Sequence, residues 1–214
     1  MNVKNTTKYN FSFTGASALI AETLVIAEEY SKLKDWKSVE QSLSDHNSLK
    51  KVKNSTFRRE FSEIKKRLSL LTDGQLNVLV HGSYDDSKAI ILLALVKTYT
   101  YLYDFVVEVI RHKYLLFDTV IEESDYIRFY NSKSITHDEL TTITELTANK
   151  VRQVVFKVLV QVGLLSHIQN GSIIKPYLSE HVLDVIIEDN PALLIAFLYS
   201  NDEIKSYIQK LQHA

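Results

Sequence analysis

Apolar residues recur at helical spacing through most of this 214-residue chain. From Val151 to Val162, valine or leucine stands at every third and fourth position, the pattern of a helix that lays one face on a core. Thr147 stands where an N-cap side chain would accept a hydrogen bond from a free amide. Gly163 ends the pattern, so we predict a helix over residues 147–163.

The residues after Gly163 have the pattern of a short β-hairpin. Two short apolar runs flank the Asn170-Gly171 dipeptide, whose preference for positive φ suits a tight turn. A helix over residues 138–145, the helix over 147–163 and this hairpin together follow the order of a winged helix-turn-helix. We therefore predict that the hairpin forms the wing of such a motif.

Helical patterns also account for most of the remaining chain. We expect further helices over residues 16–33, 36–43, 56–71, 75–81, 86–116, 179–188, 191–199 and 202–212. The helix over 86–116 is hydrophobic on nearly every side, as a central helix wrapped by others must be. The predicted fold class is mainly α: an N-terminal helical bundle over residues 1–117, then a C-terminal winged helix-turn-helix with a short β-hairpin wing and terminal helices over residues 118–214.

Composition narrows the class of protein. Five Gly and two Pro leave little room for coil, and the absence of Cys excludes disulfides, thiolate zinc sites and thiol catalysis. The first residues do not resemble a signal peptide. The longest apolar run, residues 89–96, is too short to cross a bilayer core, which takes roughly 20 residues of helix. We therefore expect a cytoplasmic protein that does not enter a membrane.

Charge is unevenly distributed along the chain, although the formal net charge is only -1. Residues 50–67 hold eight basic side chains against Glu60 and Glu63, a local charge of +6. Residues 118–139 hold six acidic side chains against Arg128 and Lys133. The near-neutral total therefore hides segments of opposite sign.

No group of residues has the spacing of a catalytic or cofactor site. The seven His are scattered, with no pair at metal-ligand spacing on one helix face, and no glycine-rich phosphate loop is present. Asp104 and Glu108 lie four residues apart, but we interpret them as half-buried acids satisfied by Lys97, Arg111 or tyrosine hydroxyls. We expect no catalytic residue, metal, cofactor or small-molecule substrate.

The helix over residues 147–163 has a polar side that suits an anionic partner. No acid occurs between Ala148 and Ser166, and donor-rich side chains of this kind bind phosphates and major-groove base edges. We predict that double-stranded DNA binds on this side, which comprises Asn149, Lys150, Arg152, Gln153 and Lys157.

Other residues of the same segment favour a docking role instead. Phe156 and Val160 fall within the polar side, which suggests that the C-terminal half of the helix packs against the first domain. The predicted wing has Lys175 as its one cation, so it would make few phosphate contacts. Because winged helices also serve as protein-interaction modules, docking of another protein stays open as an alternative.

The helix over residues 56–71 offers a second candidate surface. Its cations are spaced so that Arg58 and Lys65 share a face, and such a strip could follow a phosphate backbone. Alternatively, the strip is a solvated face with Glu60 and Glu63 in local ion pairs. The candidate DNA contacts on this helix are Arg58, Arg59, Lys65, Lys66 and Arg67.

Several blocks of the chain resemble one bacterial family over nearly its whole length. The blocks are FSFTGAS (residues 11–17), FRREFSEIKKRLSLLT (57–72), KTYTYLYDFVVEVIRHKY (97–114), FYNSK (129–133) and KVRQVVFKVLVQVGLL (150–165). They are similar, in the same order, to BrxA, a small component of BREX bacteriophage-defence systems.

The resemblance implies an all-helical, non-enzymatic accessory component with a winged helix that binds double-stranded DNA and works with other BREX proteins. A protein-protein adaptor within the defence complex is one alternative. RNA binding is another, because the family has been likened to the antitermination factor NusB.

Overall fold

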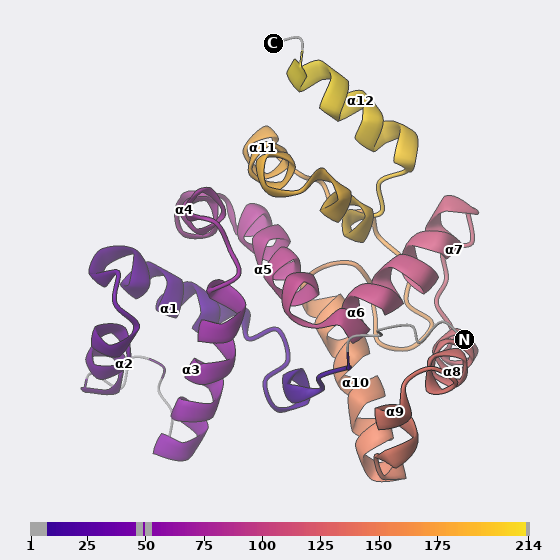
Figure 1. Ribbon diagram of the computed structural model, residues 1–214, viewed down its shortest axis with the longest axis horizontal. Coiled ribbons are helices and arrows are strands. Elements are labelled where there is room, and N and C mark those ends of the chain that lie inside the picture. The colour runs from indigo at the N-terminus through magenta and orange to yellow at the C-terminus, as the bar shows by residue number, and fades with distance from the viewer. Residues whose placement is uncertain (1–7, 46–48, 50–52, 213–214) are drawn as a thin grey trace, which may run out of the picture.

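The computed structural model describes residues 8–45, 49 and 53–212, and every regular element in those ranges is a helix (Figure 1). In chain order the helices are η1 (Ser12–Gly15), α1 (Ile20–Leu33), α2 (Trp36–Asp45), α3 (Asn54–Leu68), α4 (Asp73–His81), α5 (Tyr84–Thr98), α6 (Thr100–Phe105), η2 (Val106–Arg111), α7 (His112–Leu115), α8 (Glu123–Ser134), α9 (Asp138–Thr142), α10 (Glu145–Gln161), α11 (Glu180–Asp189), η3 (Pro191–Phe197) and α12 (Asn201–Gln212). Helices η1 and η3 are of the 3₁₀ type and η2 is a π-helix. Lys50 and Lys51 of the basic segment lie outside the described residues.

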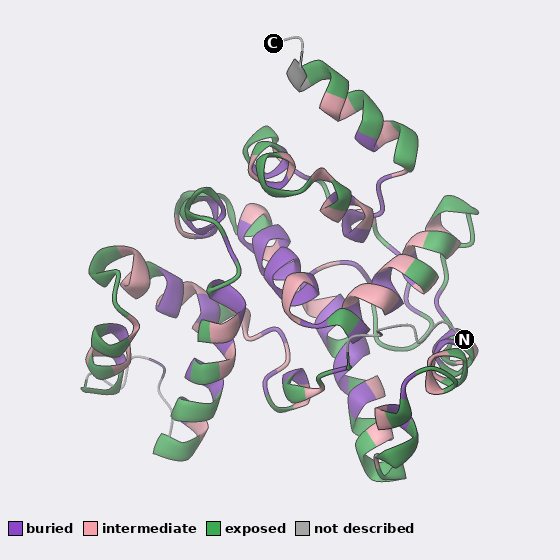
Figure 2. Cartoon of the chain, in the orientation of Figure 1, coloured by how far each residue is buried: buried purple, intermediate pink, exposed green. Residues whose placement is uncertain are grey.

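Helix α5 lies at the centre of the molecule. Ser83 and Asp86 form a capping box at its start, and every residue from Ala89 to Val96 is buried (Figure 2). A helix that is apolar on all sides must be covered on all sides. The cover comes from α1, α3 and α4 on one flank and from α6, α11 and η3 on the others (Figure 1).

The central helix breaks at Tyr99, so the prediction of one helix over residues 86–116 is wrong. Tyr99 has extended backbone angles, and the helix axis bends by 112° between the segments before and after it. Its ring is fully buried, and its hydroxyl accepts from Arg67 and donates to Glu63 of α3. These contacts with a distant helix outweigh the local helical preference.

No single helix among the described residues is long and apolar enough to cross a membrane. Only α5 together with the following run to Leu115 passes that test, across the bend at Tyr99. Both parts contribute buried side chains to the core of the molecule.

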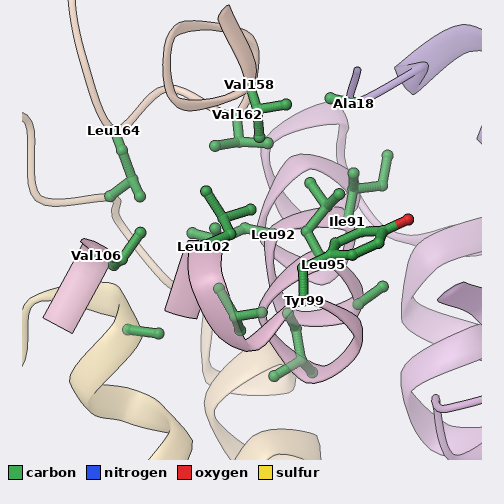
Figure 3. Close-up of a cluster of buried hydrophobic side chains, with 14 of the residues drawn as sticks. Ala18, Ile91, Leu92, Leu95, Tyr99, Leu102, Val106, Val158, Val162 and Leu164 are labelled. Carbon is green, nitrogen blue, oxygen red and sulfur yellow. The ribbon is translucent and has the colours of Figure 1, made fainter. Parts of the chain in front are cut away.

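Helix α10 packs its valine side into the core, as the periodicity predicted. Figure 3 shows Val158 and Val162 in one buried cluster with Leu92, Leu95 and Leu102. Its N-cap is Thr144, whose hydroxyl accepts from the amide of Thr147, so the helix begins one turn before the predicted cap at Thr147.

The predicted β-hairpin wing does not form. No strand occurs among the described residues, and the segment after α10 makes only the isolated bridges Leu165↔Ile173 and Val120↔Ser172. The amides of Leu164 and Leu165 both donate to the carbonyl of Leu159, which completes the end of α10. Because these amides serve the helix end, they are not free to begin a ladder, and the predicted fold class is wrong in its wing.

The chain halves share one buried cluster, which runs from Tyr9 to Ile204. Arg111, at the end of η2, donates to the carbonyl of Tyr199 and to the side chain of Asn201, which ties the terminal helices to the central ones. The division after residue 117 stays a prediction.

The end of α7 carries an exposed aromatic residue in a left-handed conformation. Phe117 has a φ of 61° and is 93% exposed. The amides of Phe117 and Asp118 donate to the carbonyls of Tyr114 and Lys113, the pattern of a Schellman cap in which glycine is usual. The cap therefore holds a bulky side chain in a backbone conformation that costs a non-glycine residue roughly 1 to 2 kcal/mol.

We predict that Phe117→Gly raises the free energy of unfolding by up to about 1 kcal/mol, because glycine adopts positive φ without the steric cost of a Cβ. Urea denaturation followed by circular dichroism measures the change. Phe117→Ala is the matched control: it removes the ring but keeps the Cβ, so it should give no gain. An equal gain in both variants would contradict the explanation.

Candidate nucleic-acid interface

The outer side of α10 is a polar, cationic face. Because the valine side of the helix is buried in the core, the side chains opposite it point to solvent. Of the predicted contacts, Asn149, Lys150, Gln153 and Lys157 are all exposed. Neither Lys150 nor Lys157 forms an ion pair with any residue that the structure describes. These four residues are hereafter the α10 face.

Arg152 is held differently from the rest of the predicted set. Its guanidinium forms an ion pair with Glu123, the first residue of α8. The Arg152 side chain is 29% exposed, whereas that of Glu123 is 64% exposed. Arg152 therefore starts from a half-buried, neutralised state, unlike the lysines of the α10 face.

The Arg152–Glu123 pair lies in a cleft of about 390 Å³ between α8, α10 and the segment that follows α10. The lining residues are Ile121, Glu123, Arg152, Gln153, Phe156, Ile168, Gln169 and Asn170. Gln153 belongs both to this lining and to the α10 face, so the two surfaces are continuous.

Phe156 is buried and packs against aromatic rings from two directions. Its ring centroid lies 6.0 Å from that of Phe105 in α6 and 5.9 Å from that of Tyr126 in α8. The expectation that this part of α10 packs inward is therefore confirmed for Phe156. The ring is not available to dock a partner.

The cations of α3 form a second exposed strip. Arg58, Arg59 and Lys65 are exposed, and neither arginine forms an ion pair within the described residues. Lys65 lies over the ring of Trp36 at 5.8 Å. Lys66 is more restrained, since its ammonium lies 3.3 Å from the Ser12 hydroxyl and 3.8 Å from the Glu63 carboxylate.

Helix η1 lies between α3 and α10 and contacts both (Figure 1). Ser12 of η1 accepts from Lys66 of α3, and just beyond η1 the amide of Ala18 donates to Gln161 at the end of α10. The two cationic surfaces are thus anchored to one short connecting segment.

Arg67 does not belong to the strip, and its prediction as a DNA contact is corrected. It is 1% exposed, and its guanidinium donates to the Tyr99 hydroxyl and to the carbonyls of Ala16 and Ala18 at 2.8 to 3.2 Å. The spacing of three from buried Ile64 was the sequence signal for this burial.

Four carboxylates of α6, η2, α8 and the segment before α8 form ion pairs with two lysines. Lys113 contacts Asp118 at 2.6 Å and Asp125 at 3.1 Å. Lys133 contacts Asp104 and Glu108, so the cation that satisfies them is Lys133 rather than Lys97 or Arg111. The expected tyrosine hydroxyl is confirmed for Asp104, which accepts from Tyr9. These pairs neutralise Asp104, Glu108, Asp118 and Asp125.

The sequence reasoning missed a polar cluster around Tyr9. The Tyr9 hydroxyl donates to Asp104 at 2.6 Å, the Tyr9 amide donates to Glu139, and the ring stacks on His137. Burial, followed by the nearby carboxylates, raises the pKa of Tyr9. No group of three or more His, Cys, Asp or Glu in the described ranges could hold a metal ion.

Comparisons with known proteins fall on one family. A family model described as BrxA matches residues 7–190. A relative from Bacillus cereus (strain H3081.97), described as "BREX protein BrxA", is 26% identical over 155 residues, which cover 72% of this chain and 76% of the relative. The crystal structure of an uncharacterized protein from Magnetospirillum magneticum has the same fold, with a TM-score of 0.76 and 20% identity over 90% of this chain and 98% of that one.

We predict that Arg67→Ala lowers the free energy of unfolding by about 3 kcal/mol or more, because it leaves the Tyr99–Glu63 pair and two buried carbonyls without their donor. Chemical denaturation measures the loss. Arg58→Ala, an exposed arginine on the same helix, should change stability by less than about 0.5 kcal/mol. Similar losses in the free energy of unfolding for the two variants would show that the buried contacts of Arg67 do not stabilise the fold.

Proposed function

The chain belongs to the BrxA family, and from this premise we propose that it is a non-enzymatic component of a BREX-type bacteriophage-defence system that binds double-stranded DNA. The name of the Bacillus cereus relative supports the assignment to BREX. The observation that most strongly supports DNA binding is the α10 face, where Lys150 and Lys157 are exposed and unpaired within the described residues.

The spacing of these side chains suits a duplex. Lys150 and Lys157 lie seven residues apart, which places them about 10 Å apart along one side of the helix. Two ammonium groups at that separation can contact phosphates of one strand. The amides of Asn149 and Gln153 lie on the same side and can donate to phosphates or pair with an adenine edge. The lysines supply affinity and the amides can supply sequence preference.

The exposed cations of α3 extend the proposed surface. Arg58 and Arg59 lie on the other helix that contacts η1, so one duplex can meet α3 and α10 if both surfaces face it. Four phosphate contacts would give a slope of roughly -3 to -4 when the logarithm of affinity is plotted against the logarithm of salt concentration. This strong salt dependence is the signature that we expect.

A second candidate function, an adaptor between defence proteins, is favoured by a different surface. At the end of α7, Leu116 is 64% exposed and Phe117 is almost wholly exposed. Adjacent exposed apolar side chains of this kind mark protein-interaction sites more often than random surface. In the adaptor role, Leu116 and Phe117 would contact the partner protein, because Phe156 is buried and cannot.

We predict that Lys150→Ala with Lys157→Ala weakens binding to a random-sequence duplex about tenfold or more at low salt and makes the salt slope shallower by about two, since two phosphate contacts are lost. Fluorescence anisotropy at a series of salt concentrations measures both quantities. Lys205→Ala with Lys210→Ala removes two exposed lysines from α12, at the opposite end of the molecule from α10 (Figure 1), and should leave both quantities unchanged.

Three outcomes of this experiment would contradict DNA binding through the α10 face. One is the absence of duplex binding by the wild type at any salt concentration. Another is an equal loss in the α12 control, which would show an effect of net charge alone. The third is tighter binding to duplex RNA than to DNA, which would favour the RNA alternative.

We further predict that Arg58→Ala with Arg59→Ala also makes the slope shallower by about two, if α3 contacts the same duplex as α10. Combined with the α10 double variant, the losses in binding free energy should add, because the two pairs are on separate helices. Unchanged binding in the α3 variant would restrict the interface to α10.

A further inference from the structure

We propose that Arg152 binds a backbone phosphate of DNA, and that the cleft around it is a subsite for the DNA backbone. In the free protein Glu123 forms an ion pair with Arg152 and blocks this site. The proposal rests on the proposed function and extends it. In the free protein the Glu123 carboxylate stands where a backbone phosphate would bind.

The two partners of the ion pair differ in how firmly they are held. Arg152 lies on α10 and is more than two-thirds covered, with Phe156 one helical turn further along and also in the cleft lining. Glu123 is the first residue of α8 and points largely into solvent. Because Glu123 lies largely in solvent, its carboxylate is hydrated when it leaves the guanidinium, and the pair contributes less free energy than a fully buried one.

A phosphate is a better partner for the vacated guanidinium. Arginine binds phosphate oxygens through two parallel hydrogen bonds, and such charge-assisted bonds are stronger than neutral ones. The cleft offers further donors, because the side-chain amides of Gln153, Gln169 and Asn170 line it. The buried residues Ile121 and Phe156 add apolar walls, which strengthen electrostatic interactions by excluding water.

The neighbouring acids are already occupied. Glu122 caps α8 and accepts from its first turn, and Asp125 is held by Lys113 and Arg128. Within the described lining of the cleft, Glu123 is thus the acid that opposes an incoming phosphate, and Arg152 is the cation that would receive it.

The position of the cleft fits this role. Gln153 contributes to both the cleft and the α10 face, so a strand that contacts Lys150 and Lys157 passes the mouth of the cleft. Exposed lysines make the first contacts, and displacement of Glu123 adds one more phosphate contact. The carboxylate therefore weakens binding of the duplex, which must displace it to reach Arg152.

The test is Glu123→Gln, which removes the charge and keeps the shape of the side chain. We expect duplex affinity to rise about threefold to tenfold, because the duplex no longer has to displace a carboxylate from Arg152. The salt slope should stay close to the wild-type value, because both complexes contain the same Arg152–phosphate contact. Glu180→Gln is the matched control, since it removes one exposed acid from α11 and alters net charge equally. It should change neither affinity nor slope.

The gain should depend on Arg152. In the Glu123→Gln background, Arg152→Gln should abolish the gain and make the slope shallower by about one, because the Arg152–phosphate contact is lost. An unchanged affinity in Glu123→Gln, a gain equal to that of Glu180→Gln, or a gain that survives Arg152→Gln would each overturn the proposal.

Failure of this inference is distinguishable from failure of the proposed function. If Lys150→Ala with Lys157→Ala weakens binding while Glu123→Gln behaves as wild type, the α10 face binds DNA and the cleft does not. If the wild type binds no duplex, both proposals are overturned together.

Discussion

The structure depends on the burial of residues 89–96 of α5. Every residue from Ala89 to Val96 is buried, so the helices around α5 must each turn an apolar side toward it. Helix α10 meets this demand with Val158 and Val162, in the same buried cluster as Leu92 (Figure 3). Because that side of α10 is committed to the core, its lysines and amides are left on the outside. The cationic face is thus a direct consequence of how the centre is covered.

A polar contact sets the direction of the chain at the end of α5. Tyr99 leaves the helical conformation, and its hydroxyl meets Arg67 and Glu63 deep in the molecule. Arg67 also binds the carbonyls of Ala16 and Ala18, which fixes the segment between η1 and α1. One buried arginine therefore joins three parts of the chain, and the connection that places η1 between α3 and α10 depends on it.

Local pattern was sufficient for the helical class, for the inward side of α10 and for the exposure of Lys150 and Lys157, because each depends on periodicity within one helix. It was insufficient for the break at Tyr99, the burial of Arg67 and the pairing of Arg152 with Glu123. Those features depend on partners far away in the sequence, which a helical wheel does not contain. At the Asn170-Gly171 dipeptide the chain bends and only Asn170 has a positive φ, so the predicted tight hairpin turn does not form. The preceding amides close the end of α10, and no hairpin ladder follows.

Lysine footprinting of the protein with and without a random-sequence DNA duplex tests DNA binding through the α10 face most directly. Acetylation of each lysine, followed by mass spectrometry, reports which ammonium groups the DNA covers. We expect Lys150 and Lys157 to lose reactivity in the complex, whereas Lys205 and Lys210 on α12 should keep theirs. Full reactivity of Lys150 and Lys157 in a saturated complex would contradict DNA binding through the α10 face.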